Sequence, residues 1–201
     1  ELFSSLGAES FDCRGPGETM SPDHGRAGYL FNATFAAIDE ADAILFVGCN
    51  PKKDAAVLNA RIRRRWRGSA LEVGVIGTRE DYGYEIEFIG SDGTALADFA
   101  GGNDPFFDKL KAATNPLVIV GNAVTAREDG KAALAAAARV AEAVAAAGNL
   151  AVGWRVFHVL HTAAGRVGGL DLGFVPSDHG KDTASMLAGG LDVLFLLGFD
   201  D

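Results

Sequence analysis

The chain has 201 residues, of which 48% are hydrophobic and 22% charged, a composition typical of a globular protein that buries a core without disulfide or metal support. Its formal net charge of −9 argues against nonspecific binding to nucleic acid, because phosphate contacts need a basic surface. No apolar run reaches the ~20 residues that a membrane-spanning helix needs, so we expect no direct membrane insertion. Cys13 and Cys49 are too few for a disulfide framework. One bridge between them is an option, but two reduced thiols in a reducing compartment fit this count better.

The ends of the chain indicate a piece of a longer protein. The chain begins at Glu1 without Met, on an apolar stretch typical of the end of a helix. It stops at Asp201, shortly after a strand-like run. We therefore expect further chain beyond residues 1–201.

Strand-like and helical segments alternate along the chain. The first half contains a weak strand candidate at 10–14, a helix at 29–40, a strand at 43–48, a helix at 54–67, a strand at 71–76 and a weak strand candidate at 85–89. The second half contains helices at 94–100 and 105–113, a strand at 117–121, helices at 129–147, 154–167 and 181–188, and a strand at 193–198. The strong strand candidates are short continuous apolar runs, typical of strands that are buried on both faces of a parallel sheet. The alternation predicts a three-layer α/β fold with a mainly parallel sheet.

Positive charge is concentrated in the helix predicted at 54–67. Residues 1–67 carry nine basic and nine acidic groups, whereas residues 68–201 carry nine basic and 18 acidic groups. Around an apolar stripe of this helix stand five arginines: Arg61, Arg63, Arg64, Arg65 and Arg67. A solvated helix face is the simpler interpretation. A docking surface for an acidic neighbour is the sharper one, because arginine is favoured in bidentate pairs and at interfaces.

Two glycine turns follow predicted strands and are the candidate binding site. Ligands in open α/β sheets sit at the carboxyl ends of the strands, and a glycine there lets the backbone approach a phosphate. The residues are Gly48, Asn50 and Pro51 after one strand and Gly121 and Asn122 after another. Glycine and Asn-Pro are also ordinary turn residues, and the chain has neither a G-x-x-x-x-G-K-[ST] loop nor a G-x-G-x-x-G turn after a strand. A nucleotide or anion is therefore one interpretation of these turns.

Other residues that carry chemistry are isolated. His158 and His161 lie on one face of the helix predicted at 154–167, but a catalytic zinc normally needs three protein ligands, so we expect no metal site. Cys49, at a strand-to-helix turn, is a candidate thiol nucleophile with either histidine as its base. A half-buried, inert cysteine is the favoured alternative. We expect no catalytic residue in this chain.

Several strings in order together resemble a known family. They comprise residues 28–51, 58–63, Trp66, 116–121, 129–130, Trp154, His161, 170–173 and 193–198. In this order they resemble the molybdopterin-oxidoreductase-like part of the large iron–sulfur subunit (the G subunit) of respiratory NADH:quinone oxidoreductase (complex I). The resemblance spans nearly the whole chain and is most specific at 29–63.

The resemblance implies a fold like that of formate dehydrogenase or dimethyl sulfoxide reductase, built from dinucleotide-binding-like α/β units. Residues 1–201 are then one domain fragment, in which about 175–201 begin a neighbouring α/β unit. In cofactor-using relatives the loop at Gly48–Pro51 belongs to a region that contacts a pterin guanine dinucleotide. Here Lys52, Lys53 and Asp54 stand where those relatives have an acidic residue or histidine, and the molybdenum-ligating cysteine or serine has no counterpart. The resemblance to the complex I branch of the family implies that the pterin has been lost.

The function that the resemblance implies is that of a non-catalytic scaffold. Electrons pass from NADH to quinone through iron–sulfur clusters held in an N-terminal part of the full subunit, and this chain carries no cofactor. The partners are the other subunits of complex I and the rest of the same polypeptide, at the cytoplasmic face of the bacterial inner membrane. The alternatives are a nucleotide- or anion-binding module that keeps a vestigial pterin crevice, and an independent thiol enzyme that uses Cys49.

Overall fold

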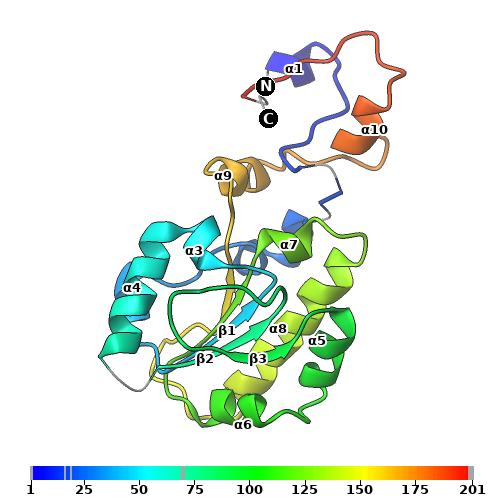
Figure 1. The fold of residues 1–201 in the computed structure, drawn as a ribbon. Coiled ribbons are helices and arrows are strands. Elements are labelled where there is room, and N and C mark those ends of the chain that lie inside the picture. Colours follow the sequence, from blue (N-terminus) through cyan, green and yellow to red (C-terminus); the bar gives the residue numbers. More distant parts are fainter. Residues whose placement is uncertain (1, 16, 19, 69–70, 199–201) are drawn as a thin grey trace.

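The computed structural model describes residues 2–15, 17–18, 20–68 and 71–198. At its centre is a five-stranded sheet with strand order β3-β2-β1-β4-β5, in which every pairing is parallel (Figure 1). The strands are β1 (Ala43–Val47), β2 (Glu72–Ile76), β3 (Glu87–Gly90), β4 (Pro116–Val120) and β5 (Phe157–Val159). The prediction of an α/β fold with a mainly parallel sheet is confirmed.

Helices cover both faces of the sheet, so the molecule has the three expected layers (Figure 1). One face is covered by α2 (Phe35–Glu40) and α4 (Ala56–Arg67), which pack on Ile44 and Phe46 of β1. The other face is covered by α5 (Gly93–Ala100), α6 (Pro105–Ala112) and α8 (Gly130–Ala146), which pack on Leu45 and Val47. The remaining helices are α1 (Leu2–Ser5), α3 (Pro51–Asp54), α7 (Asn122–Thr125), α9 (Arg166–Asp171), α10 (Thr183–Leu187) and the 3₁₀ turns Pro22–His24 and Arg26–Gly28.

The central strands are buried on both faces, as their sequence predicts. All five residues of β1 and all five of β4 are buried. Because successive side chains of a strand point to opposite faces, an unbroken apolar run fills both core layers at once. None of the helices in the described part of the chain is long and apolar enough to cross a membrane.

Side-chain caps fix the starts of several helices. Asp92 accepts a hydrogen bond from the Ala95 amide at the start of α5 (2.9 Å), and Asp104 accepts one from the Phe106 amide at the start of α6 (2.8 Å). Each cap satisfies an amide that has no partner within its helix. These caps set the first turns of α5, which directly follows β3, and of α6, which follows α5.

The first and last described segments of the chain form a small lobe beside the α/β body, and this lobe contains α1 and α10 (Figure 1). Within it the ring centroids of Phe3 and Phe195 lie 4.7 Å apart. The Cys13 amide donates to the Phe174 carbonyl (2.9 Å), and the Thr183 amide donates to Asp12 (3.0 Å). The lobe leaves large apolar side chains exposed, among them Leu6 and those of residues 193–197.

The helix predicted at 154–167 is wrong. Its middle forms the edge strand β5, which pairs in parallel with β4. The physical reason is that β4 offers an unpaired edge and that Val156 and Val159 are buried beside it. Trp154 also donates to the Pro116 carbonyl at the start of β4 (2.7 Å), which ties the segment to the sheet.

The strand predicted at 193–198 is wrong as well. These residues form no strand, and Val193 and Leu197 are more than 80% exposed, at 82% and 86%. An apolar run becomes a strand only beside a strand edge, and the described residues place none there.

Smaller differences concern the limits of elements. The weak candidate at 85–89 is confirmed as β3, whereas 10–14 forms no strand. The helix predicted at 29–40 begins only at Phe35, with Thr34 as its cap. The helix predicted at 54–67 is interrupted at Ala55, which separates α3 from α4. The helix predicted at 181–188 is the shorter α10.

Replacing Gly74 with alanine tests the packing of α6 on the sheet. A Cβ at Gly74 would lie 2.5 Å from the ring of Phe106, which is fully buried. Overpacking of this kind typically costs about 1–3 kcal/mol. We expect a fall of that size in the free energy of unfolding by chemical denaturation. Gly168→Ala is the control, because nothing lies within 4 Å of its added Cβ; equal losses in the two variants would contradict the packing described.

Candidate functional site

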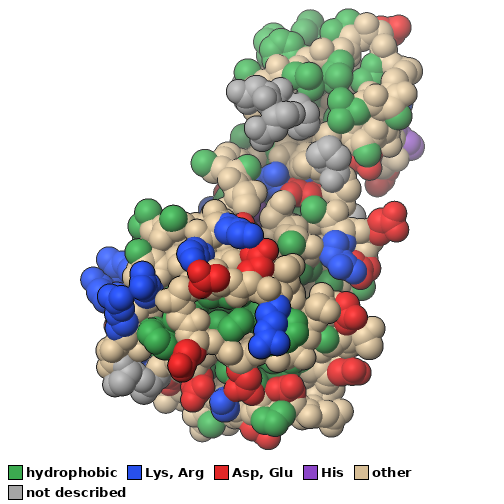
Figure 2. Space-filling model, viewed as in Figure 1, with side chains coloured by type: hydrophobic (Ala, Val, Ile, Leu, Met, Phe, Trp, Pro, Cys, Tyr) green, Lys and Arg blue, Asp and Glu red, His purple; other side chains and the backbone are tan. Residues whose placement is uncertain are grey.

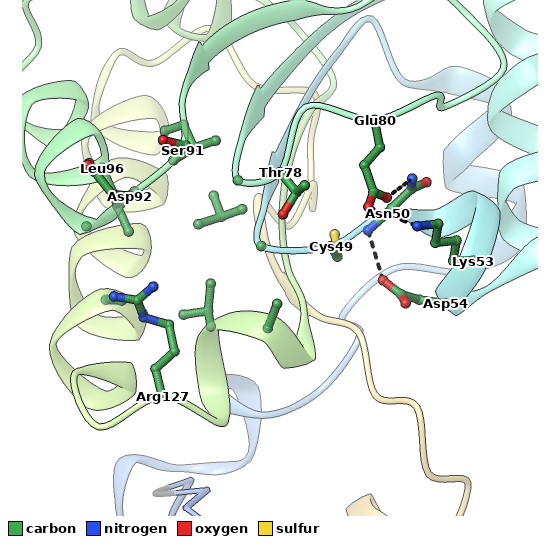
Figure 3. Close-up of a pocket in the computed structure, with 18 of the residues that line it drawn as sticks. Cys49, Asn50, Lys53, Asp54, Thr78, Glu80, Ser91, Asp92, Leu96 and Arg127 are labelled. Atoms are coloured by element: carbon green, nitrogen blue, oxygen red, sulfur yellow. Dashed lines mark hydrogen bonds and ion pairs between the residues drawn. The ribbon is translucent and has the colours of Figure 1, made fainter.

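The candidate site lies where the chain reverses its winding direction. From β1 the sheet extends through β2 to β3 on one side and through β4 to β5 on the other, so β1 and β4 flank the switch point. In doubly wound sheets ligands bind in the crevice at the carboxyl ends of these strands. A cavity of ≈ 290 Å³ opens there, and Gly48, Asn50, Lys53, Glu80 and Arg127 are among its lining residues (Figure 3).

Gly48 and Gly121 are required by contacts within the chain itself. A Cβ at Gly121 would lie 2.1 Å from the Cβ of Cys49 and 2.7 Å from the Gly48 carbonyl oxygen. Gly48 has φ +60, and its Cβ would lie 2.3 Å from a methyl carbon of Val124. The two glycines therefore let the turns after β1 and β4 touch and give Val124 its place. Close approach of a phosphate is not needed to explain them.

The turn at Asn50 and Pro51 is a capped helix start whose donors are already bound. Asn50 accepts a hydrogen bond from the Lys52 amide (3.1 Å), and Pro51 occupies the first position of α3. The Asn50 amide itself donates to the carboxylate of Asp54 (2.8 Å). An anion approaching this helix start therefore meets a carboxylate where it would need a free N–H.

Glu80 binds two further hydrogen-bond donors at this end of the crevice. Its carboxylate accepts from the Asn50 side-chain amide (2.9 Å) and from the Lys53 ammonium (2.8 Å), as the dashed lines in Figure 3 show. The hydrogen bonds from Lys53 and Asn50 lower the pKa of Glu80 below its usual value, so it stays ionised. Lys53 is thus neutralised by the chain itself.

On the opposite wall of the crevice a second cation, Arg127, is also paired with a carboxylate of the chain itself. Arg127 forms a bidentate pair with Asp129, with nitrogen–oxygen distances of 2.6 and 2.8 Å. The hydrogen bond from Arg127 lowers the pKa of Asp129. Lys53 and Arg127 are the cations of the lining, and its anions are Asp54, Glu80, Asp92 and Asp129. The lining therefore carries two more negative than positive groups.

The predicted site residues are only partly brought together. Gly48 and Asn50 line the cavity, whereas Pro51, Gly121 and Asn122 are not among its lining residues. Asn122 starts α7 and is close to the hydroxyl of Thr125 (3.3 Å). The sequence analysis missed the acidic residues of the lining and Arg127. Most of these missed residues follow the carboxyl ends of β2 and β3 or flank α7, the helix after β4. A search for charged residues after every predicted strand would therefore have identified them.

The histidines do not share a helix face, which corrects the prediction for them. His158 is fully buried in β5, 4.9 Å from the Phe31 ring, and its Nε2 lies 2.9 Å from the Arg155 carbonyl oxygen. Burial lowers the pKa of His158 to about 4, so it is neutral near pH 7. The Nε2 of His161 lies 2.6 Å from the Tyr29 carbonyl oxygen. No group of three potential metal ligands occurs among the described residues.

Cys49 is held as a buried thiol. Its Sγ lies 3.6 Å from the Ile119 carbonyl oxygen, and burial raises its pKa far above the ordinary value. Because the thiolate is the reactive form, this environment works against nucleophilic chemistry. Both Cys49 and Cys13 are free, so the bridge between them is not formed.

A doubly wound parallel sheet with glycine turns at its switch point defines the class, an α/β domain of the dinucleotide-binding type. The family model described as Molybdopterin oxidoreductase matches residues 1–201, and the chain belongs to that family.

Relatives agree with the resemblance to the large iron–sulfur subunit of complex I, which is confirmed. The 78 kDa subunit of mitochondrial NADH-ubiquinone oxidoreductase from Neurospora crassa is 40% identical, over 100% of this chain and 26% of that protein. NADH dehydrogenase (ubiquinone) iron-sulfur protein 1 from Solanum tuberosum is 35% identical, with the same two shares. The G subunit of NADH-quinone oxidoreductase from Rickettsia bellii is 36% identical, over 88% of this chain and 24% of that protein. The chain spans about a quarter of the length of these relatives.

Among solved structures, one similar chain belongs to the formyltransferase/hydrolase complex of Methylorubrum extorquens, crystallised with methylofuran. The two chains are 20% identical with a TM-score of 0.46, and the match covers 80% of this chain and 52% of the other. No inference about function follows from a likeness of this degree.

The crevice does not suit the pterin dinucleotide that the family name implies. A dinucleotide carries a diphosphate, which needs free N–H donors and cations. The Asn50 amide is held by Asp54, Lys53 is held by Glu80, and the lining has an excess of carboxylates. The absence of a cofactor from this chain remains a prediction, and this set of donors supports it.

Inorganic diphosphate tests whether the crevice is closed to anions. We expect millimolar diphosphate to leave the melting temperature of the protein unchanged. The double variant Asp54→Asn, Glu80→Gln frees the Asn50 amide and Lys53, and we expect its melting temperature to rise by a few degrees with the same ligand.

A matched control removes two acidic groups elsewhere. Asp98 and Glu142 are exposed on α5 and α8, outside the crevice. Asp98→Asn with Glu142→Gln changes the net charge equally and should not create a response to diphosphate. Stabilisation of the unaltered protein by diphosphate would contradict the closed crevice.

Proposed function

We propose that this chain is a scaffold domain, with no catalytic site of its own, in the large iron–sulfur subunit of an NADH:quinone oxidoreductase. In this proposal the iron–sulfur clusters that carry electrons from NADH to quinone are held elsewhere in the same subunit. The names of the relatives support the assembly. The observation that supports the scaffold role is the crevice at the switch point, where carboxylates of the chain itself bind both cations, Lys53 and Arg127, and the N–H groups of Asn50.

The partners proposed are the other subunits of that complex and the rest of the same polypeptide. The proposed location is the peripheral arm, at the cytoplasmic face of the inner membrane in a bacterium. The names of the relatives support only the kind of enzyme, because all three belong to an NADH dehydrogenase or NADH:quinone oxidoreductase, two of them mitochondrial and one from a bacterium. The face of the membrane is proposed from the resemblance alone.

The terminal lobe is proposed to meet neighbouring parts of the assembly, with residues from about 175 onward beginning the next α/β unit. The support is the exposure of apolar side chains there, such as Leu194 (42%) and Phe195 (60%). Contiguous exposed apolar surface is typical of surfaces that other protein covers. A strand at 193–198 is not part of this proposal, because the described residues form none.

The alternative, a nucleotide- or anion-binding module, has weaker support. It requires Asp54 and Glu80 to release the Asn50 amide and Lys53 when the anion arrives. Both carboxylates would then lie beside the anion, and like charges at such distances repel. The thiol-enzyme alternative fails on the buried, high-pKa state of Cys49.

Purification of the full-length polypeptide from its source cell tests the proposal. With an affinity tag on this polypeptide, we expect the fraction from detergent-solubilised membranes to oxidise NADH with a quinone acceptor. Asp54→Asn with Glu80→Gln should leave that rate close to the wild-type rate, because a scaffold crevice takes no part in the chemistry.

Two results would count against it. A tagged fraction without NADH:quinone activity would remove the assignment to this complex. A proton-transferring group typically contributes about 10²–10⁴-fold to a rate, so a loss of that size in the crevice variant would show a catalytic role. The Asp98→Asn, Glu142→Gln variant is the control for a general effect of charge.

A further inference from the structure

The outer face of α4 carries basic side chains around a shallow hollow. Ala56, Ala60, Arg63, Arg64 and Arg67 are exposed on this face. Ala60 lies four residues after Ala56, Arg63 and Arg64 lie three and four residues after Ala60, and Arg67 lies four residues after Arg63, so these residues share one side of the helix. Lys52 and Asn59 complete the lining of the hollow, and the lining contains no acidic residue. Figure 2 shows basic side chains gathered over α4.

Other basic groups of this region hold α4 in the fold. Arg61 and Arg64 both pair with Asp39 of α2, at 2.6 and 2.7 Å. Lys52 pairs with Asp81. These contacts explain part of the basic cluster by structure alone, and they leave Arg63 and Arg67 to be explained.

For Arg63 and Arg67 the described part of the chain supplies no ion pair within 4 Å and no side-chain hydrogen bond. The hydrogen bond from Lys52 lowers the pKa of Asp81, and Arg63 is close enough to that carboxyl to help lower it. The two residues are four apart on the helix, so their like charges lie one turn from each other and repel. Their place in the second half of α4 offsets some of this through the helix dipole. A pair of neighbouring guanidinium groups facing solvent is well suited to bind carboxylates.

The charge of the surroundings narrows the class of partner. The basic groups Lys52, Arg61, Arg63, Arg64 and Arg67 outnumber their paired carboxylates, Asp39 and Asp81, by five to two. The whole chain has a net charge of −9. A long polyanion such as nucleic acid would extend from this small basic face onto acidic surface, whereas a short acidic segment of a protein would not.

We propose that the outer face of α4 binds an acidic segment of another polypeptide. Two carboxylates of that segment, about one helical turn apart, pair with Arg63 and Arg67. The small side chains of Ala56 and Ala60 let the backbone of the segment lie close to α4. This inference rests on the proposed function only in taking the partner to be another subunit of the same assembly.

Site-specific photo-cross-linking in the assembled, full-length protein tests the inference. The probe is p-benzoylphenylalanine in place of Val57, which is 73% exposed and adjoins the hollow without lining it. After irradiation, we expect mass spectrometry to find a peptide of a different polypeptide with at least two Asp or Glu residues. Arg63→Glu with Arg67→Glu should lower the cross-link yield about tenfold, the effect of losing two charge pairs at an interface.

Two comparisons keep this test specific. Lys131→Glu with Arg139→Glu makes the same change of charge at exposed positions of α8 and should leave the yield unchanged. Arg63→Lys with Arg67→Lys keeps the charge, loses the bidentate geometry and should retain an intermediate yield. Because Arg61 and Arg64 are untouched in every variant, the contacts between α4 and Asp39 remain.

The inference is overturned if the probe forms no cross-link to another polypeptide and reacts only with its own polypeptide, with lipid, with nucleic acid or with nothing. It is also overturned if the cross-link yield is the same in the Arg63→Glu, Arg67→Glu variant as in the unaltered protein. The proposed function fails separately. An acidic partner outside the NADH:quinone oxidoreductase would support the docking surface and contradict the proposed assembly. A chain that lies in the oxidoreductase without an acidic segment on α4 would support the assembly and contradict the docking surface.

Discussion

The contact between the turns after β1 and β4 is the constraint on which the rest of the site depends. Gly121, in the turn after β4, lies so close to Cys49 and Gly48 that a single added carbon would collide with the turn after β1. This contact brings the carboxyl ends of two parallel strands together at the switch point and gives Val124 its place over Gly48. The crevice at the carboxyl ends of the strands is therefore bordered by turns that the chain's own packing holds in place.

Electrostatics acts in the same direction as packing. Asp54 binds the amide at the start of α3, Glu80 binds Lys53, and Asp129 binds Arg127. The Asn50 amide, Lys53 and Arg127 are thus already paired, and the lining carries two more negative than positive groups. On α4 the balance is the opposite, since Arg63 and Arg67 face solvent without an ion pair in the described part of the chain. The paired donors of the crevice and these two solvent-facing arginines of α4 together support the proposal that this domain contacts protein rather than a small anionic ligand.

The parts of the fold and of the candidate site that the sequence could predict are those that depend on residues near one another in the chain. The strands β1, β2 and β4 were predicted correctly because a continuous apolar run indicates a strand that is buried on both faces. Asn50 and Pro51 were predicted to form the turn after β1 because a capping residue followed by proline indicates the start of a helix. The edge strand β5 was missed, because its pairing depends on the free edge of β4 and not on its own pattern. The run at 193–198 failed for the related reason that an apolar pattern needs a neighbour to become a strand. Glu80 and Arg127 were missed because they belong to segments far along the chain from Gly48 and Asn50, and only the folded structure brings their side chains to the crevice.

The most direct test of the closed crevice is a cofactor analysis of the full-length protein purified in its assembly. Molybdenum and tungsten would be measured by plasma mass spectrometry, and pterin by the fluorescence of its oxidised form. The account predicts iron in the assembly but neither of the two metals nor pterin in stoichiometric amount. One pterin dinucleotide per polypeptide would contradict it, because Asp54 and Glu80 would then have to yield the Asn50 amide and Lys53 to the ligand.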